Sequence, residues 1–159
     1  MLRAARPFAR HGHSDNEEEF MKALSALLLA AAVAFAPAVS HAQKAERQRL
    51  VLQVSENDPG VWNLTLNNAE NVQQALGKDN VDVEIVAYGP GLNMLKADSK
   101  VAPRLNAALD SSVSLLACGT TMRKTKVTQA DLTSGVKVVP GGIIHIMQRQ
   151  SEGWNYVRP

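Results

Sequence analysis

The chain has 159 residues, 45% of them apolar, and its 17 lysines and arginines against 15 aspartates and glutamates give a formal net charge of +2. This balance offers no strongly basic surface, so we expect no nucleic-acid partner. A single cysteine excludes a framework of intramolecular disulfides.

Residues 21–42 predict a signal peptide. The segment has Lys22 near its start, an apolar run from Ala26 to Val39, and a small-x-small pattern at Ser40–Ala42. The run is shorter than the roughly 20 residues that a membrane-spanning helix needs. We therefore expect export to the periplasm and no membrane contact after cleavage. A uniform Ala/Leu core helix is the alternative interpretation of this segment.

The first 20 residues do not resemble the start of a signal peptide. An acidic run at Glu17–Glu19 stands where a signal peptide carries positive charge. We therefore expect Met21 to be the native start and residues 1–20 to be a non-native or leader extension. Cleavage after Ala42 leaves residues 43–159, which are enough for one compact domain with a core and too short for two.

The mature chain begins with a strand pattern followed by a helix pattern. Apolar residues alternate in 49–55, as in a strand. Asp58 and Pro59 then predict a helix start, and Gly77 predicts its end. The expected apolar positions of this helix are Trp62, Leu66, Ala69, Val72 and Leu76. Three asparagines on the same helix, at positions 67, 68 and 71, either bond to a loop or another subunit or form a plain polar surface.

The pattern then alternates to the end of the chain. Residues 81–89 predict a second strand, and a helix is expected from near Pro103, with its apolar face at Ala102, Leu105, Ala108 and Leu109. Residues 113–118 are nearly all apolar, which predicts a strand covered on both faces at the centre of the sheet. A short helix (119–126), a strand (136–139), a helix (143–150) with Ile143, Ile146 and Met147 on one face, and a last strand (154–157) complete the prediction.

Strands that alternate with helices predict a three-layer α/β/α sandwich on a five-stranded, mainly parallel sheet. Ligands of such sheets collect at the carboxyl ends of the strands. Three loops of this chain follow strands there, "SENDPG", "YGPG" and "ACGTT". The residues expected to line a cleft are Cys118, Gly119, Thr120, Thr121, Asn57, Tyr88, Gly89 and Gly91.

Cys118 is the candidate reactive residue. It ends a predicted strand just before a helix start, where unpaired N–H groups and the helix dipole favour a thiolate. Two alternatives remain: a small buried apolar residue, or a disulfide between two copies of the chain.

The sequence gives little support for a catalytic histidine, a metal site or a dinucleotide-binding site. His145 is the one histidine of residues 43–159, so a Cys–His dyad or a serine triad would need it; it is otherwise an exposed or satisfied side chain. One cysteine and one histidine without clustered carboxylates do not make a zinc site, so we expect no metal and no cofactor. "GPGLNM" begins like a dinucleotide fingerprint, but it follows the second strand and has Met94 where the last glycine belongs, which favours a tight turn.

The order of "VSENDPGVWNLTLNNAENVQQALG", "EIVAYGPGLNML", "LLACGTTM" and "VKVVPGGIIHIMQRQSEGWNYVRP" resembles the DsrE/DsrF-like family from about Leu50 to Pro159. The resemblance implies a homo-oligomer or hetero-oligomer, often a trimer or hexamer. It also implies a sulfurtransferase or sulfur carrier, in which Cys118 takes up sulfane sulfur as a persulfide from a donor and passes it to the thiol of an acceptor protein or small sulfur compound.

The sequence departs from the family pattern in two respects. Thr120 stands where the family often has asparagine in Cys-Gly-Asn-Thr-Met, and the chain carries an export signal although the family's sulfur-relay complexes work in the cytoplasm. The rival hypothesis is a non-catalytic oligomeric scaffold that binds a small ligand and has a structural, buried Cys118.

Overall fold

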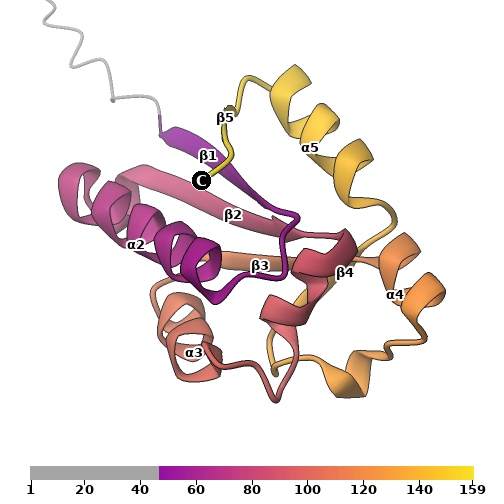
Figure 1. Ribbon diagram of the computed structural model, residues 1–159. Coiled ribbons are helices and arrows are strands. Elements are labelled where there is room, and N and C mark those ends of the chain that lie inside the picture. Colours follow the sequence, from indigo (N-terminus) through magenta and orange to yellow (C-terminus); the bar gives the residue numbers. More distant parts are fainter. Residues whose placement is uncertain (1–46) are drawn as a thin grey trace, which may run out of the picture. The chain divides into compact units, whose positions relative to one another are not determined.

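The computed structural model describes residues 47–159, in which five strands alternate with four α-helices (Figure 1). The elements are β1 (Gln48–Val54), α2 (Pro59–Leu76), β2 (Val81–Ala87), α3 (Ala102–Asp110), β3 (Ser114–Cys118), α4 (Gly119–Thr125), β4 (Lys137–Val139), α5 (Gly142–Ser151) and β5 (Asn155–Val157). The expected leader extension and signal peptide lie outside the described residues. No helix within 47–159 has the length and apolar character to cross a membrane.

All five strands form one sheet in the order β4-β3-β2-β1-β5, and each neighbouring pair is parallel. The predicted three-layer sandwich with a five-stranded parallel sheet is therefore confirmed. The prediction that 113–118 form the central strand is wrong, because β2 is the middle strand and β3 lies between β2 and β4. A run of apolar residues indicates a strand that is covered on both faces of the sheet. Every interior strand is covered in this way, so the run does not specify the position of the strand in the sheet.

The two faces of the sheet are covered unequally. Helices α2 and α3 lie on one face, where Trp62, Leu66 and Leu105 pack into a large apolar core (Figure 1). Helix α5 lies on the other face, where a much smaller buried cluster consists of Val51, Val86, Leu116, Val139 and Ile146. Because both faces are covered, Val51 and Gln53 of β1 are buried together with the alternating residues that the sequence pattern singled out.

Helix α2 begins as predicted. The side chain of Asp58 accepts a hydrogen bond from the N–H of Gly60 at 2.7 Å, Pro59 occupies the first helical turn, and Gly77 ends the helix with φ +84°. Leu76 was expected on the buried face but is 44% exposed. It is the final residue of α2 and is followed by a polar turn, so it lies beyond the part of the helix that packs on the sheet.

Helices α2 and α3 are also joined by polar contacts. The guanidinium of Arg104 on α3 donates to the side-chain oxygens of Asn63 (2.8 Å) and Asn67 (2.9 Å) and pairs with Glu70 at 2.7 Å. Asn67 therefore bonds to a neighbouring helix of the same chain. The sequence had predicted either a plain polar surface for this asparagine or a bond to a loop or another subunit.

Helix α5 does not pack through the apolar face that its sequence indicated. Ile146 is buried, but Ile143 is 47% and Met147 58% exposed. The side turned to the sheet carries His145 and Arg149, both of which contact Glu84 of β2. A buried carboxylate, and not apolar spacing alone, thus sets the rotation of α5 about its own axis.

Candidate functional site

Cys118 is the last residue of β3, and α4 begins at the next residue. Its side chain lies on the α5 face of the sheet and is buried, with the residue only 5% exposed. The backbone N–H of Gly142, the first residue of α5, donates a hydrogen bond to Sγ at 3.1 Å. The sulfur is therefore held between the end of one strand and the start of a helix 24 residues further on.

The backbone of Gly142 lies directly against Cys118 and Tyr88. A Cβ atom on Gly142 would lie 3.0 Å from Cβ of Tyr88 and 3.3 Å from Cβ of Cys118. These distances are tighter than ordinary side-chain contacts, so only glycine lets the backbone of α5 come this close to the sulfur. The close approach is what brings the N–H of Gly142 within hydrogen-bonding distance.

The environment of Cys118 lowers the pKa of its thiol below the ordinary value. Burial acts to raise the pKa, but hydrogen bonding from the Thr121 hydroxyl and from the backbone N–H groups of Gly142 and Thr121 stabilises the thiolate and outweighs burial. The N–H of Gly89 donates to Oγ1 of Thr121 at 2.9 Å, which leaves the hydroxyl proton of Thr121 free to point at the sulfur. The sequence predicts both threonines beside the thiol; Thr121 lies there, whereas the hydroxyl of Thr120 bonds to the carbonyl oxygen of Pro140.

Thr120 and Gly119 connect the site to the loop between β4 and α5. The N–H and the hydroxyl of Thr120 both donate to the carbonyl oxygen of Pro140, at 3.2 and 3.0 Å. A Cβ atom on Gly119 would lie 3.1 Å from the carbonyl oxygen of Val139. These contacts tie the first turn of α4 to the chain segment that delivers Gly142.

The loops "YGPG" and "SENDPG" were both expected beside Cys118, but only part of the first lies there. "YGPG" does reach the site, through Tyr88 and Gly89. Gly91 instead packs on the end of β1, where an added Cβ would lie only 2.4 Å from the carbonyl oxygen of Val54. Asn57 lines a different pocket. Of the expected cleft residues, Asn57 and Gly91 therefore do not contact the thiol.

A pocket of about 410 Å³ lies beside the thiol. Its wall includes Tyr88, Gly89, Thr120, Thr121 and Lys124. Cys118 itself is not part of this wall. Thr121 therefore belongs both to the wall of the pocket and to the surroundings of the thiol.

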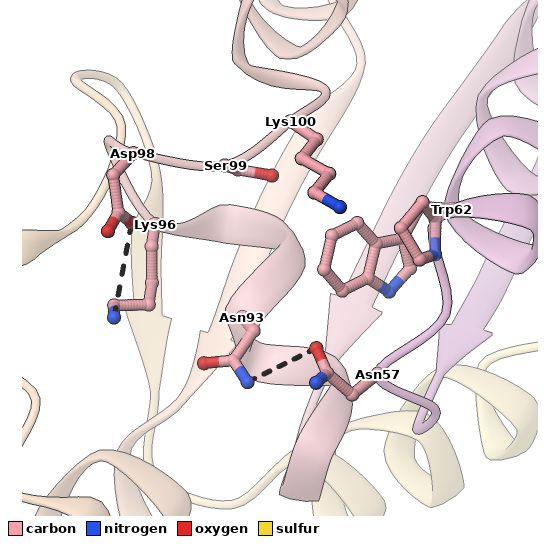
Figure 2. A pocket seen from close by; sticks show the side chains of 8 residues that line it. Asn57, Trp62, Asn93, Lys96, Asp98, Ser99 and Lys100 are labelled. Atoms are coloured by element: carbon pink, nitrogen blue, oxygen red, sulfur yellow. Dashed lines mark hydrogen bonds and ion pairs between the residues drawn. The ribbon is translucent and has the colours of Figure 1, made fainter.

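The pocket that contains Asn57 is separate, at about 390 Å³, and is shown in Figure 2. Figure 2 shows the Lys100 side chain beside the Trp62 ring and the amide of Asn93 reaching Asn57, a hydrogen bond of 3.2 Å. Asn93 also lines the pocket beside Cys118. It is the residue that these two pockets share.

His145 is engaged away from the thiol. Its Nε2 lies 2.7 Å from Oε2 of Glu84, and the side chain is only 14% exposed. Arg149 binds the same carboxylate with Nε at 2.9 Å and Nη2 at 2.8 Å. This arrangement favours the interpretation of His145 as a satisfied side chain over that of a base for Cys118.

Sequence reasoning missed Gly142 and Glu84. Glu84 is an acidic residue at an inward position of an apolar strand, "VDVEIVA", and that mismatch was a signal in the sequence. The role of Gly142 had only the weak signal of a glycine pair before a helix. Within residues 47–159, no group of three or more His, Cys, Asp and Glu side chains is arranged to hold a metal ion.

Comparison with known proteins agrees with this architecture. The DsrE/DsrF-like family matches residues 9–159. A protein of unknown function from Methanobacterium thermoautotrophicum is 36% identical, with a TM-score of 0.68 over 70% of this chain and 99% of its own. Two more distant structures share the fold. The ychN protein from E. coli is 15% identical, with a TM-score of 0.60 over 70% of this chain and 99% of its own. A conserved protein of unknown function from Bacteroides thetaiotaomicron is 16% identical, with a TM-score of 0.60 over 72% of this chain and 97% of its own. No curated protein matches the chain. The chain therefore belongs to the DsrE/DsrF-like family.

Proposed function

We propose that this protein is a sulfur carrier in which the Cys118 thiolate accepts and passes on sulfane sulfur. The observation that carries the proposal is the hydrogen bond of 3.1 Å from the N–H of Gly142 to Sγ, and the surroundings of the sulfur lower the pKa of this thiol. Membership of the DsrE/DsrF-like family supports a role of the sulfur-relay type. A single cysteine suits such a role, because relay needs one thiolate and no resolving cysteine in the same chain.

The proposed chemistry is an exchange without net oxidation. The Cys118 thiolate attacks the outer sulfur of a donor persulfide, a new S–S bond forms at Cys118, and the donor leaves as a thiolate. The thiolate of an acceptor protein or a small sulfur compound then attacks the outer sulfur of the Cys118 persulfide. The acceptor becomes the persulfide, and the Cys118 thiolate is regenerated.

The test is to incubate the folded protein with sodium polysulfide and to measure its intact mass. We expect the gain of one sulfur atom by the native protein and no gain by Cys118→Ser, because serine offers no sulfur nucleophile. Alkylation of Cys118 before the incubation should block the gain as well. A thiol that takes up no sulfur until the protein is denatured would rule the proposal out.

A second candidate function rests on the burial of the same residue. Cys118 is 5% exposed and is absent from the pocket wall, as a structural cysteine would be. In this alternative the protein is a non-catalytic oligomeric scaffold, and a small ligand occupies one of its pockets. The polysulfide experiment separates the two functions, since a structural Cys118 stays unmodified in the folded protein.

We further propose that the protein forms homo-oligomers, trimers or hexamers, as the family resemblance implies. Support comes from the outer side of α5, where Ile143, Ile144 and Met147 are 47%, 59% and 58% exposed. Three adjacent apolar side chains on one helix are a candidate interface between subunits.

A charge on this side of α5 should disrupt such an assembly. We expect Met147→Glu to reduce the molar mass in solution from an oligomer to a monomer, because burying a carboxylate without a partner is unfavourable. Light scattering after size exclusion measures the change. Leu64→Glu places the same charge at an exposed apolar position of α2 (47% exposed) and should leave the oligomer intact. An unchanged mass in Met147→Glu would exclude this surface as the interface.

The location and processing of the protein belong to the same proposal. We propose that residues 21–42 direct export, that cleavage after Ala42 releases residues 43–159, and that the mature domain works in the periplasm. The acceptor would then be a periplasmic thiol. N-terminal sequencing of the protein from its native cell tests this: a mature chain that starts at Gln43 supports export, and one that retains Met21 contradicts it.

A further inference from the structure

Helix α5 determines the surroundings of the Cys118 thiol. Its first residue, Gly142, donates the hydrogen bond to Sγ and lies directly against the Cys118 side chain. Any displacement of the start of α5 would therefore change two properties at once. It would remove a donor that stabilises the thiolate, and it would expose the sulfur to reagents.

Apolar packing holds α5 only in part. Gly142 and Ile146 are the buried residues of this helix. The cluster that Ile146 joins on this face of the sheet is much smaller than the core on the opposite face. The position of α5 must then depend to a large degree on its polar contacts with the sheet.

Those contacts converge on Glu84. This carboxylate belongs to the middle strand, β2, and the residue is 7% exposed. It accepts two hydrogen bonds from Arg149 and one from His145, at 2.7 to 2.9 Å. His145 and Arg149 are four residues apart, so both lie on the same side of α5.

The contacts with Glu84 and the contact with the thiol share one turn of α5. The N–H of His145 closes the first turn by bonding to the carbonyl oxygen of Gly141 at 3.0 Å. Gly142 lies inside that turn. A helical turn moves as a unit, because its backbone hydrogen bonds fix its dihedral angles, so a side chain that holds His145 also holds Gly142.

We infer that Glu84 is a positioning residue for Cys118: by binding His145 and Arg149, it holds the start of α5 over the sulfur and keeps the N–H of Gly142 on Sγ. Glu84 does not touch the thiol. The inference concerns the thiol itself and holds whether or not Cys118 carries sulfur.

The test is the rate at which iodoacetamide alkylates the native protein, measured from pH 5 to pH 10. The midpoint of the profile reports the pKa of the thiol, and the plateau at high pH reports access to the thiolate. In Glu84→Gln we expect a higher midpoint and a plateau rate raised several-fold, because α5 is released at the turn that lies against the Cys118 side chain. Charged and titratable groups near the thiol are Tyr88, which follows β2 and whose pKa burial raises, and Arg123 on α4.

Glu152→Gln is the matched control. Glu152 also pairs with Arg149, at 2.7 Å, but it lies at the end of α5, is 48% exposed and does not join the helix to the sheet. We expect Glu152→Gln to leave the midpoint and the plateau of the alkylation profile unchanged. His145→Gln removes one of the three bonds to Glu84 and should shift both values in the same direction as Glu84→Gln, by less.

A lower thermal stability of Glu84→Gln with an unchanged alkylation profile would overturn the inference, because Glu84 would then act on stability alone. If Glu84→Gln does not fold, the profile of His145→Gln decides in the same way. No sulfur donor is used, so a native protein that fails to gain sulfur from polysulfide leaves the outcome of this experiment intact.

Discussion

Replacing Gly91 with alanine is expected to lower the free energy of unfolding by about 3 kcal/mol, the upper part of the usual range for overpacking. The added Cβ would lie 2.4 Å from the carbonyl oxygen of Val54 and 2.9 Å from the backbone nitrogen of Ser55. These are backbone atoms at the end of β1, where Val54 is paired with Ala87 of β2. They cannot rotate away as a flexible side chain would, so the loop or the strand must shift.

Urea unfolding followed by circular dichroism measures this effect. Gly141→Ala is the matched control, because its Cβ would meet no atom closer than 3.6 Å and its backbone is extended. We expect the control to lose less than about 1 kcal/mol, the usual scale for alanine at the start of a helix. Equal losses in the two variants would show that close approach to β1 is not what requires glycine at position 91.

Replacing Glu84 with glutamine is expected to lower the free energy of unfolding by about 3 kcal/mol at neutral pH, because removing one partner of a buried ion pair leaves the other partner uncompensated. Arg149 would keep Glu152 and its contact with the ring of Trp154, 4.8 Å from the ring centroid, but would lose its buried carboxylate. Glu152→Gln, which removes the exposed partner, should cost less than about 1 kcal/mol.

The loss of unfolding free energy in Glu84→Gln should depend on pH. Burial acts to raise the pKa of Glu84, but the hydrogen bonds and charges of Arg149 and His145 outweigh it, so the pKa in the folded protein lies below its ordinary value. A carboxylate with a lowered pKa stabilises the fold above its unfolded pKa of about 4.3, and this stabilisation disappears as the pH falls through the folded value.

The difference in unfolding free energy between the native protein and Glu84→Gln should therefore be complete at pH 7 and shrink below about pH 4. Urea unfolding at a series of pH values from 3 to 7 measures it. A difference that stays constant over this range would show that the charge of Glu84 is not the source of its contribution.

Local patterns in the sequence predicted most of the fold. Asp58, Pro59 and Gly77 mark the ends of α2 where the structure has them, because capping depends on the backbone geometry of a few adjacent residues. The alternation of strand and helix patterns was sufficient to predict the parallel three-layer sandwich. It did not identify β2 as the middle strand, because burial on both faces is common to all interior strands.

Part of the site was predictable for the same local reason. Cys118, Gly119, Thr120 and Thr121 are consecutive residues, so their common place at the end of β3 follows from a single strand and a helix start. Asn57 and Gly91 were assigned to the same cleft because their loops leave the same edge of the sheet. That edge is wide enough for two pockets, and a sequence pattern does not specify which pocket a loop lines.

The sequence by itself therefore determined the elements, their parallel arrangement and a cysteine at the carboxyl end of a strand, since these depend on the periodicity and capping of contiguous residues. Only the tertiary structure decided what acts on that cysteine. Gly142 reaches the sulfur from 24 residues away, and Glu84 holds His145 from 61 residues away. Such contacts result from how the layers pack, because a hydrogen bond depends on the distance between two groups in space and not on their separation along the chain.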